Sequence, residues 1–149
     1  EGVAGALQSG NLGYPVIGVR AKITGHQVDQ TLSNDTAFAA AGADAVHKAL
    51  RDNMTLLEPV MRLEVTIPEE FLGPVSSDLN IRRAEIREVH QRGKLQVIES
   101  VVPLRAMFDY SDKVRSLTQG RAGWSMEPQS YAPAPPDVVN AMLNPDGNY

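Results

Sequence analysis

Several features that mark common functional classes are missing from this 149-residue chain. It has no cysteine, which excludes disulfide bonds, thiolate metal sites and cysteine nucleophiles. Aromatic residues make up only 5% of the sequence, so a hydrophobic core must rest mainly on aliphatic side chains and methionine. No apolar run approaches the ~20 residues that a membrane-spanning helix needs. The sequence therefore predicts no membrane segment, and we expect a cytoplasmic location, with an organellar one left open.

An excess of basic residues is also missing. The chain carries 14 Lys and Arg against 18 Asp and Glu, for a net charge of −4. Residues 1–56, residues 57–131 and the tail each hold more acidic than basic groups. This balance argues against a protein that binds nucleic acid through overall phosphate neutralisation. It does not exclude local contacts made by clusters of arginine.

What the sequence does contain is a faint internal repeat with an offset of 35 residues. The offset superposes Glu64 on Glu99, Pro68 on Pro103, and Ser76 on Ser111. Each copy shows the pattern of a strand, a proline, a helix, and an exit that contains arginine. A duplicated unit of this kind predicts two similar halves that pack into one domain.

The elements expected from this pattern follow the order β-α-β-β-α-β. Alternating apolar residues predict strands over 58–67, 84–90, 95–102 and 121–127. One helix is expected from Gly73-Pro74 to about residue 83, and a second from a cap at Asp109 or Ser111 to Thr118. Residues 91–94 should form the hairpin turn between the two halves. This order predicts an α+β fold, the ferredoxin-like sandwich of four antiparallel strands under two helices.

The flanking regions predict a second, incomplete unit and a tail. Residues 1–55 show a short helix over 2–9, a strand over 16–23, a polar loop over 24–34, and a helix over 36–52. Residues 56–131 form the predicted sandwich, and residues 132–149 form a proline-rich tail that begins near Tyr131. Within the tail we expect one helical turn over 138–143 and a loose end over 144–149.

The motifs of common enzymes are absent. Gly93-Lys94 lacks the remaining residues of a phosphate-binding loop, and no nucleophile-elbow pattern surrounds the serines. The three histidines, His26, His47 and His90, show no metal-ligand spacing among themselves. The sequence thus predicts no catalytic, cofactor or metal residue in this chain.

Two polar clusters are the candidate contact sites. The first consists of four arginines at or just after the ends of the predicted helices: Arg82, Arg83, Arg115 and Arg121. They either complement the helix dipoles and pair with Asp78, Glu85 and Asp112, or bind a phosphate or a protein partner. The second is the loop over 25–31, with His26, Gln27, Asp29 and Gln30. It is either an ordinary exposed loop or a contact carried by a rigid scaffold.

Several motifs resemble the C-terminal third of translational elongation factor G. They lie at 57–65, 78–83 and 102–104, and the most specific is Leu117-Thr118-Gln119-Gly120-Arg121-Ala122. Two further stretches, residues 13–16 and 35–38, resemble the end of the preceding domain. The resemblance covers about residues 1–131.

The resemblance implies that residues 56–131 are domain V, a ferredoxin-like module. Residues 1–55 would be the C-terminal part of domain IV, an α/β domain like that of a ribosomal protein. The implied parent is a monomeric, ribosome-dependent GTPase that drives tRNA–mRNA translocation. Its partners would be ribosomal RNA, proteins of the stalk base and the tRNA–mRNA on the decoding side. GTP and magnesium would bind in a region outside this chain.

One departure from the family concerns the tip of domain IV. An ungapped alignment puts Asp29 where translocating members usually carry a histidine, and His26 lies three residues earlier. A carboxylate is repelled by phosphates, so the departure favours a paralogous elongation factor G that acts in ribosome recycling. Two alternatives from other classes are a stand-alone ferredoxin-like binding module and a small acyl-phosphate hydrolase on the same sandwich. The hydrolase needs a phosphate-binding loop after its first strand, and the sequence has none there.

Overall fold

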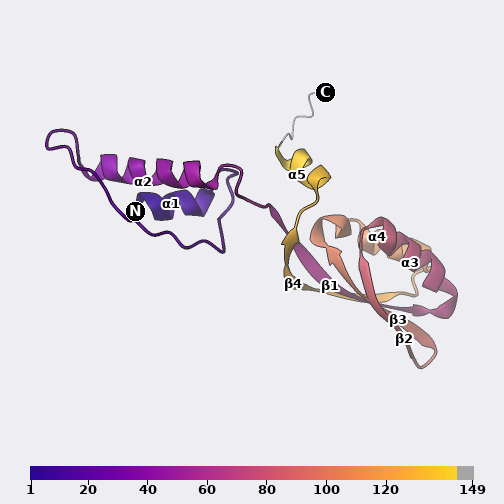
Figure 1. The fold of residues 1–149 in the computed structure, drawn as a ribbon. Coiled ribbons are helices and arrows are strands. Elements are labelled where there is room, and N and C mark those ends of the chain that lie inside the picture. The colour runs from indigo at the N-terminus through magenta and orange to yellow at the C-terminus, as the bar shows by residue number, and fades with distance from the viewer. Residues whose placement is uncertain (144–149) are drawn as a thin grey trace. The chain divides into compact units, whose positions relative to one another are not determined.

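The structure, a computed structural model, describes residues 1–143 and divides into two compact units (Figure 1). Among the described residues, unit 1 comprises residues 1–55 together with residues 140–143, and unit 2 comprises Leu56–Val139. None of the helices in residues 1–143 combines the length and the apolar character that crossing a membrane requires.

Unit 2 contains a four-stranded antiparallel sheet. Its strands are β1 (Leu57–Pro68), β2 (Glu85–Arg92), β3 (Leu95–Pro103) and β4 (Gly123–Pro133), in the spatial order β2-β3-β1-β4. The helices α3 (Leu72–Ile81) and α4 (Tyr110–Leu117) lie on one face of the sheet (Figure 1). This arrangement confirms the predicted α+β, ferredoxin-like sandwich.

The core of unit 2 lies between the sheet and these two helices. The inward positions of β1 are fully buried, because alternate residues of a strand point to the same face. The cluster joins residues from β1, β3, α3 and α4: Leu63, Val65, Ile67, Ile98, Val102, Val75, Leu79, Tyr110 and Val114. Trp124 of β4 packs edge-to-face on Tyr110, with ring centroids 5.5 Å apart.

The 35-residue repeat is visible as a two-fold relation within this unit. Glu64 and Glu99, which the offset superposes, are direct partners across the β1–β3 ladder. Both strands end in a proline and continue into a 3₁₀ turn, η1 (Glu69–Phe71) after β1 and η2 (Leu104–Met107) after β3. Buried positions of the two helices also repeat at this offset, as Val75 with Tyr110 shows. Each half therefore contributes the same face to the shared core.

The hairpin turn and the C-terminal region refine the predicted boundaries. β2 and β3 are joined by Gly93-Lys94, and Gly93 has a φ of 66°, which suits the first central residue of a type II′ turn. β4 continues to Pro133, where it pairs with Leu57, so the last strand extends beyond its predicted end at residue 127 and into the first two residues of the predicted tail over 132–149. The helix α5 spans Pro136–Leu143 and is longer than the expected single turn. The expectation for 144–149 lies outside the described residues.

Unit 1 contains two packed helices, α1 (Gly2–Ser9) and α2 (Asp35–Leu50). The Asn34 side chain caps α2 by accepting the N–H of Ala37 at 2.8 Å. The helices meet so closely that a Cβ at Gly2 would lie 1.9 Å from the Ala39 carbonyl oxygen. Glycine is therefore required at this contact.

The predicted strand over 16–23 is wrong. The segment has apolar residues at strand spacing, yet Ile17, Val19 and Ile23 are 65%, 49% and 76% exposed. Within residues 1–143 no strand pairs with this segment, and all the strand pairs lie in unit 2. A strand needs a partner for its backbone hydrogen bonds, so the local pattern alone does not produce one here.

Candidate functional site

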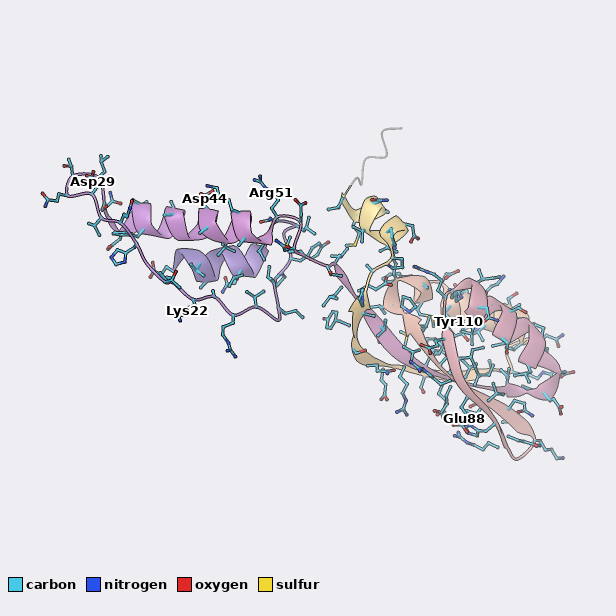
Figure 2. The ribbon with its side chains drawn as sticks, viewed as in Figure 1. Lys22, Asp29, Asp44, Arg51, Glu88 and Tyr110 are labelled. Carbon is cyan, nitrogen blue, oxygen red and sulfur yellow. The ribbon has the colours of Figure 1, made fainter. Side chains whose placement is uncertain are left out.

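The polar loop of unit 1 ends in a hydrogen-bonded turn built around Asp29 (Figure 2). The Asp29 carboxylate accepts the backbone N–H of Thr31 at 2.8 Å and that of Leu32 at 2.9 Å. In return, the Asp29 N–H donates to the Ser33 hydroxyl at 2.8 Å. These bonds form an Asx-type turn, a local structure that aspartate makes readily. Asp29 therefore shapes the loop as well as giving it a negative charge.

The same bonds act on the acidity of Asp29. The N–H of Thr31, and to a smaller extent that of Leu32, lowers the pKa of the carboxyl, because both donors favour the charged form. Asp29 thus carries a full negative charge at neutral pH.

The other candidate residues of the loop, His26, Gln27 and Gln30, are exposed. The His26 ring lies edge-on to Phe38 of α2, with ring centroids 6.1 Å apart and planes 81° from parallel. This contact keeps the imidazole beside the first turns of the helix. The loop therefore presents two amides, an imidazole and a carboxylate to solvent, which are groups that bind RNA edges and protein backbones.

The four arginines do not form one cluster. Arg82, at the end of α3, binds Asp109, which directly precedes α4, whereas Arg121, after α4, binds Glu70, which precedes α3. The two helices are therefore antiparallel. Arg82 and Arg83 lie at one end of the helical layer, and Arg115 and Arg121 lie toward the other. The sequence placed all four at helix ends correctly, but their grouping required the relative direction of the helices.

Arg82 is held inside unit 2. Its Nε donates to Asp78 at 2.7 Å, its Nη1 donates to Asp109 at 2.6 Å and to the Ala106 carbonyl, and its guanidinium lies 5.2 Å from the centroid of the Tyr110 ring. Only 9% of its side chain is exposed. Asp109 is the main reason that the pKa of Arg82 is raised, and Arg82 in turn lowers the pKa of Asp109. The geometry gives Arg82 a structural role that joins α3 to the start of α4.

The remaining three arginines are accessible. Arg83 has a φ of 62° and lies 4.0 Å from Asp137, with 43% of its side chain exposed. Arg115 lies 3.9 Å from Asp112 and is 71% exposed, whereas Arg121 binds Glu70 and stacks on the Phe71 ring. Of the three carboxylates considered as partners of these arginines, Asp78 pairs with Arg82 and Asp112 pairs with Arg115. Glu85 binds Arg87 instead, at 2.9 Å.

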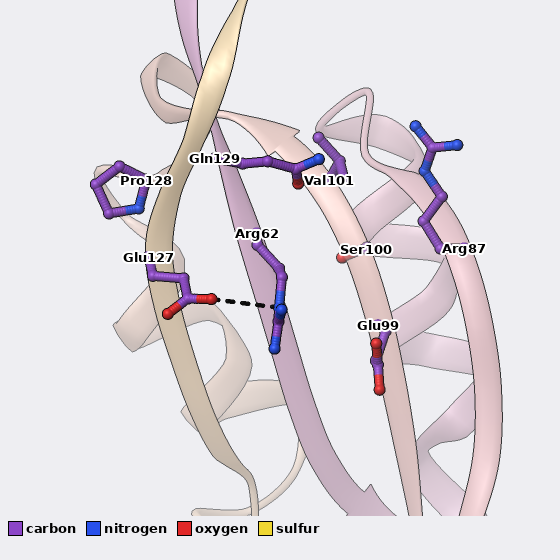
Figure 3. A pocket seen from close by; sticks show the side chains of 8 residues that line it. All are labelled: Arg62, Arg87, Glu99, Ser100, Val101, Glu127, Pro128 and Gln129. Atoms are coloured by element: carbon purple, nitrogen blue, oxygen red, sulfur yellow. Dashed lines mark ion pairs between the residues drawn. The ribbon is translucent and has the colours of Figure 1, made fainter.

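The sequence did not indicate a candidate site on the face of the sheet that the helices leave uncovered. It carries an open hollow of about 530 Å³, in which Arg62 binds Glu127 at 3.4 Å (Figure 3). The hollow is lined by Arg62, Arg87, Glu99, Ser100, Val101, Glu127, Pro128 and Gln129. Beside it, Glu88, His90 and Glu99 form a group of possible metal ligands. The alternation of Glu88 and His90 along one strand was the available signal, but the third residue comes from the next strand.

The sheet order and the two helices on one face define unit 2 as a ferredoxin-like α+β domain with accessible arginines at the ends of its helical layer. The sequence profile described as elongation factor G C-terminus matches residues 55–142. Because this match covers more than half of the chain, the chain belongs to that family.

Individual relatives extend the similarity into unit 1. The chain is 41% identical over 145 residues to elongation factor G of Fervidobacterium nodosum, covering 96% of this chain and 21% of that protein. A crystal structure of a protein from Thermus thermophilus matches with a TM-score of 0.79 and 33% identity, covering 97% of this chain and 22% of that one. The chain thus spans about one-fifth of the length of each of these two relatives.

Proposed function

We propose that this chain is the ribosome-binding C-terminal part of a translational GTPase that promotes tRNA–mRNA translocation. The observation that carries the proposal is the 41% identity to an elongation factor G over 145 residues, which cover 96% of this chain. In this proposal residues 1–55 belong to domain IV and residues 56–131 to domain V. GTP and magnesium would bind in the region of the parent that this chain does not contain.

In this proposal the two sets of exposed residues contact different parts of the ribosome. Arg83, Arg115 and Arg121 would contact ribosomal RNA or proteins at the stalk base, since guanidinium groups bind phosphates and carboxylates in a bidentate manner. The loop residues His26, Gln27 and Gln30 would lie on the decoding side, near the tRNA–mRNA. Arg82 would support the surface from inside, because its donors already bind Asp78 and Asp109.

A second candidate function is ribosome recycling by a paralogous elongation factor G. Asp29 favours it, because this charged carboxylate at the tip of the loop would be repelled by the phosphates near which the loop lies in a translocating factor. Full-length protein distinguishes the two functions in a reconstituted system. GTP-dependent translocation without subunit splitting supports the first, and splitting that needs the recycling factor, without translocation, supports the second. A reading frame that lacks a phosphate-binding loop and switch regions upstream of residue 1 would contradict both.

Substitution of Asp29 tests whether the loop approaches phosphate. Asp29→Asn keeps the Oδ1 acceptor of the turn and removes the charge, so we expect binding to ribosomes at low salt to tighten about two- to fivefold. Asp29→Lys should tighten it at least as much, provided that the turn persists. Both gains should shrink as salt is raised, because salt screens exposed charges. Cosedimentation with ribosomes over a salt series measures this.

A matched control is Asp44→Asn, which removes an exposed carboxylate of α2 that pairs with Lys48 at 2.6 Å. An equal gain for both Asn variants would mean that net charge alone matters. No gain for Asp29→Asn would remove Asp29 from the proposed contact surface.

A further inference from the structure

Three carboxylates lie in a row on the uncovered face of the unit 2 sheet. In the strand register Glu88 of β2 is the partner of Glu99 of β3, and Glu99 is in turn the partner of Glu64 of β1. Like charges directly opposite each other on neighbouring strands destabilise a sheet. Glu64 is compensated by Arg92, whose Nη1 lies 3.2 Å from its carboxylate. Among residues 1–143, Glu88 has no ion pair and Glu99 has only the contact described next.

That contact is with His90, which lies on the same face of β2 as Glu88, two residues further on. Its Nδ1 atom is 4.0 Å from Oε1 of Glu99. This nitrogen is shielded from solvent and has no hydrogen-bond partner among the described residues. One potential ligand atom from each of Glu88, His90 and Glu99 lies within 4.8 Å of the other two. An imidazole without a partner thus faces two carboxylates that lack a strong counter-ion.

We propose that Glu88, His90 and Glu99 bind a divalent transition-metal ion of the zinc type. Zinc takes imidazole nitrogen and carboxylate oxygen at about 2.0–2.2 Å, so small side-chain rotations would bring the three donors to one ion. Three protein ligands leave the fourth position to water. The imidazole favours zinc over magnesium, which prefers oxygen ligands in an octahedral shell.

The position of the site indicates what the ion would do. Glu88 and His90 follow the irregularity in the ladder between Ile86 and Glu88, and β2 is an edge strand of the sheet. An ion held by both strands links this edge to β3 and neutralises the opposed pair of Glu88 and Glu99. The bound ion therefore stabilises the β2–β3 hairpin.

Calorimetric titration of the untagged chain with Zn²⁺ at neutral pH tests the proposal. We expect one ion per chain at this site, with an affinity that falls as the pH is lowered, because protons compete with the metal for the ligand atoms. His90→Gln and Glu99→Gln should each weaken binding at least tenfold. Equimolar Mg²⁺ should not displace the ion. Zinc-dependent shifts of the His90 imidazole signals in NMR spectra report on the same site without any substitution.

Two control variants match these substitutions. Glu64→Gln removes the third carboxylate of the row, which Arg92 already pairs, and His47→Gln removes a histidine of α2. Both should bind zinc within twofold of the original chain. Fluorescence of Trp124 shows that each variant is folded, because this ring packs on Tyr110 in the core of unit 2. Zinc binding that is absent, or unchanged in His90→Gln and Glu99→Gln, overturns the proposal, as does an unshifted His90 imidazole.

Discussion

Arg82→Ala should lower the free energy of unfolding of unit 2 by about 3 kcal/mol. The substitution leaves Asp78, whose side chain is 9% exposed, without the guanidinium that pairs with it at 2.7 Å. Breaking a buried ion pair by removing one partner costs about 3–5 kcal/mol, because the remaining charge stays desolvated. It also breaks the links from α3 to Ala106 and Asp109. Urea denaturation followed by Trp124 fluorescence measures the loss.

Arg115→Ala is the matched control, because Arg115 is also an arginine near a helix end with a carboxylate partner. Its side chain is 71% exposed and lies 3.9 Å from Asp112, so its removal should cost less than about 1 kcal/mol. Equal losses for the two variants would show that Arg82 does not hold the helical layer together.

The dependence of stability on pH is a second test of the contact between Arg82 and Asp109. The hydrogen bond from Arg82 lowers the pKa of Asp109 in the folded state below its unfolded value of about 4. Stability from this group is therefore present above pH ~4 and is lost as the pH falls through the folded pKa. In Arg82→Met the decline below pH ~4 should be shallower than in the original chain, when both are followed by urea denaturation at several pH values.

Leu63→Ala should destabilise unit 2 by a comparable amount, about 2–5 kcal/mol. Leu63 is fully buried on β1, the strand between β3 and β4, and belongs to the core cluster beneath the helices. Truncating a buried leucine removes its transfer free energy and leaves a cavity that the surroundings fill only in part. Chemical denaturation with Trp124 as the probe measures this change as well.

The comparison variant is Ile81→Ala, at a residue of α3 that is 81% exposed. It should change the unfolding free energy by less than about 0.5 kcal/mol. A cost for Leu63→Ala as small as that for Ile81→Ala would be inconsistent with the sandwich core described for unit 2.

The fold of unit 2 could be predicted because local pattern and tertiary structure agree there. Apolar alternation marked β1, the prolines marked the ends of β1 and β3, and the repeat tied the two halves together. The segment over 16–23 shows the opposite case. Its alternation of apolar and basic residues is as regular as that of a strand, yet pairing depends on a partner that its own residues do not specify.

For the candidate sites, the sequence predicted which residues lie at the ends of helices or in loops, but not which other residues they contact. The sequence indicated that Arg82 and Arg115 lie at helix ends, but not that Arg82 would be enclosed by carboxylates from α3 and from the start of α4. Asp29 was recognised as a charge and not as the acceptor that closes its turn. The group of Glu88, His90 and Glu99 required the register of β2 against β3. In each case the missing information was a contact between segments distant in sequence, or a local hydrogen bond.

Binding of the 149-residue chain to ribosomes, in competition with a full-length elongation factor G, tests the central proposal most directly. We expect saturable binding that weakens as salt is raised and that the full-length factor displaces, because both would occupy the same site. Binding that the factor does not displace, or no binding at low salt, would contradict the assignment of this chain as a ribosome-binding region.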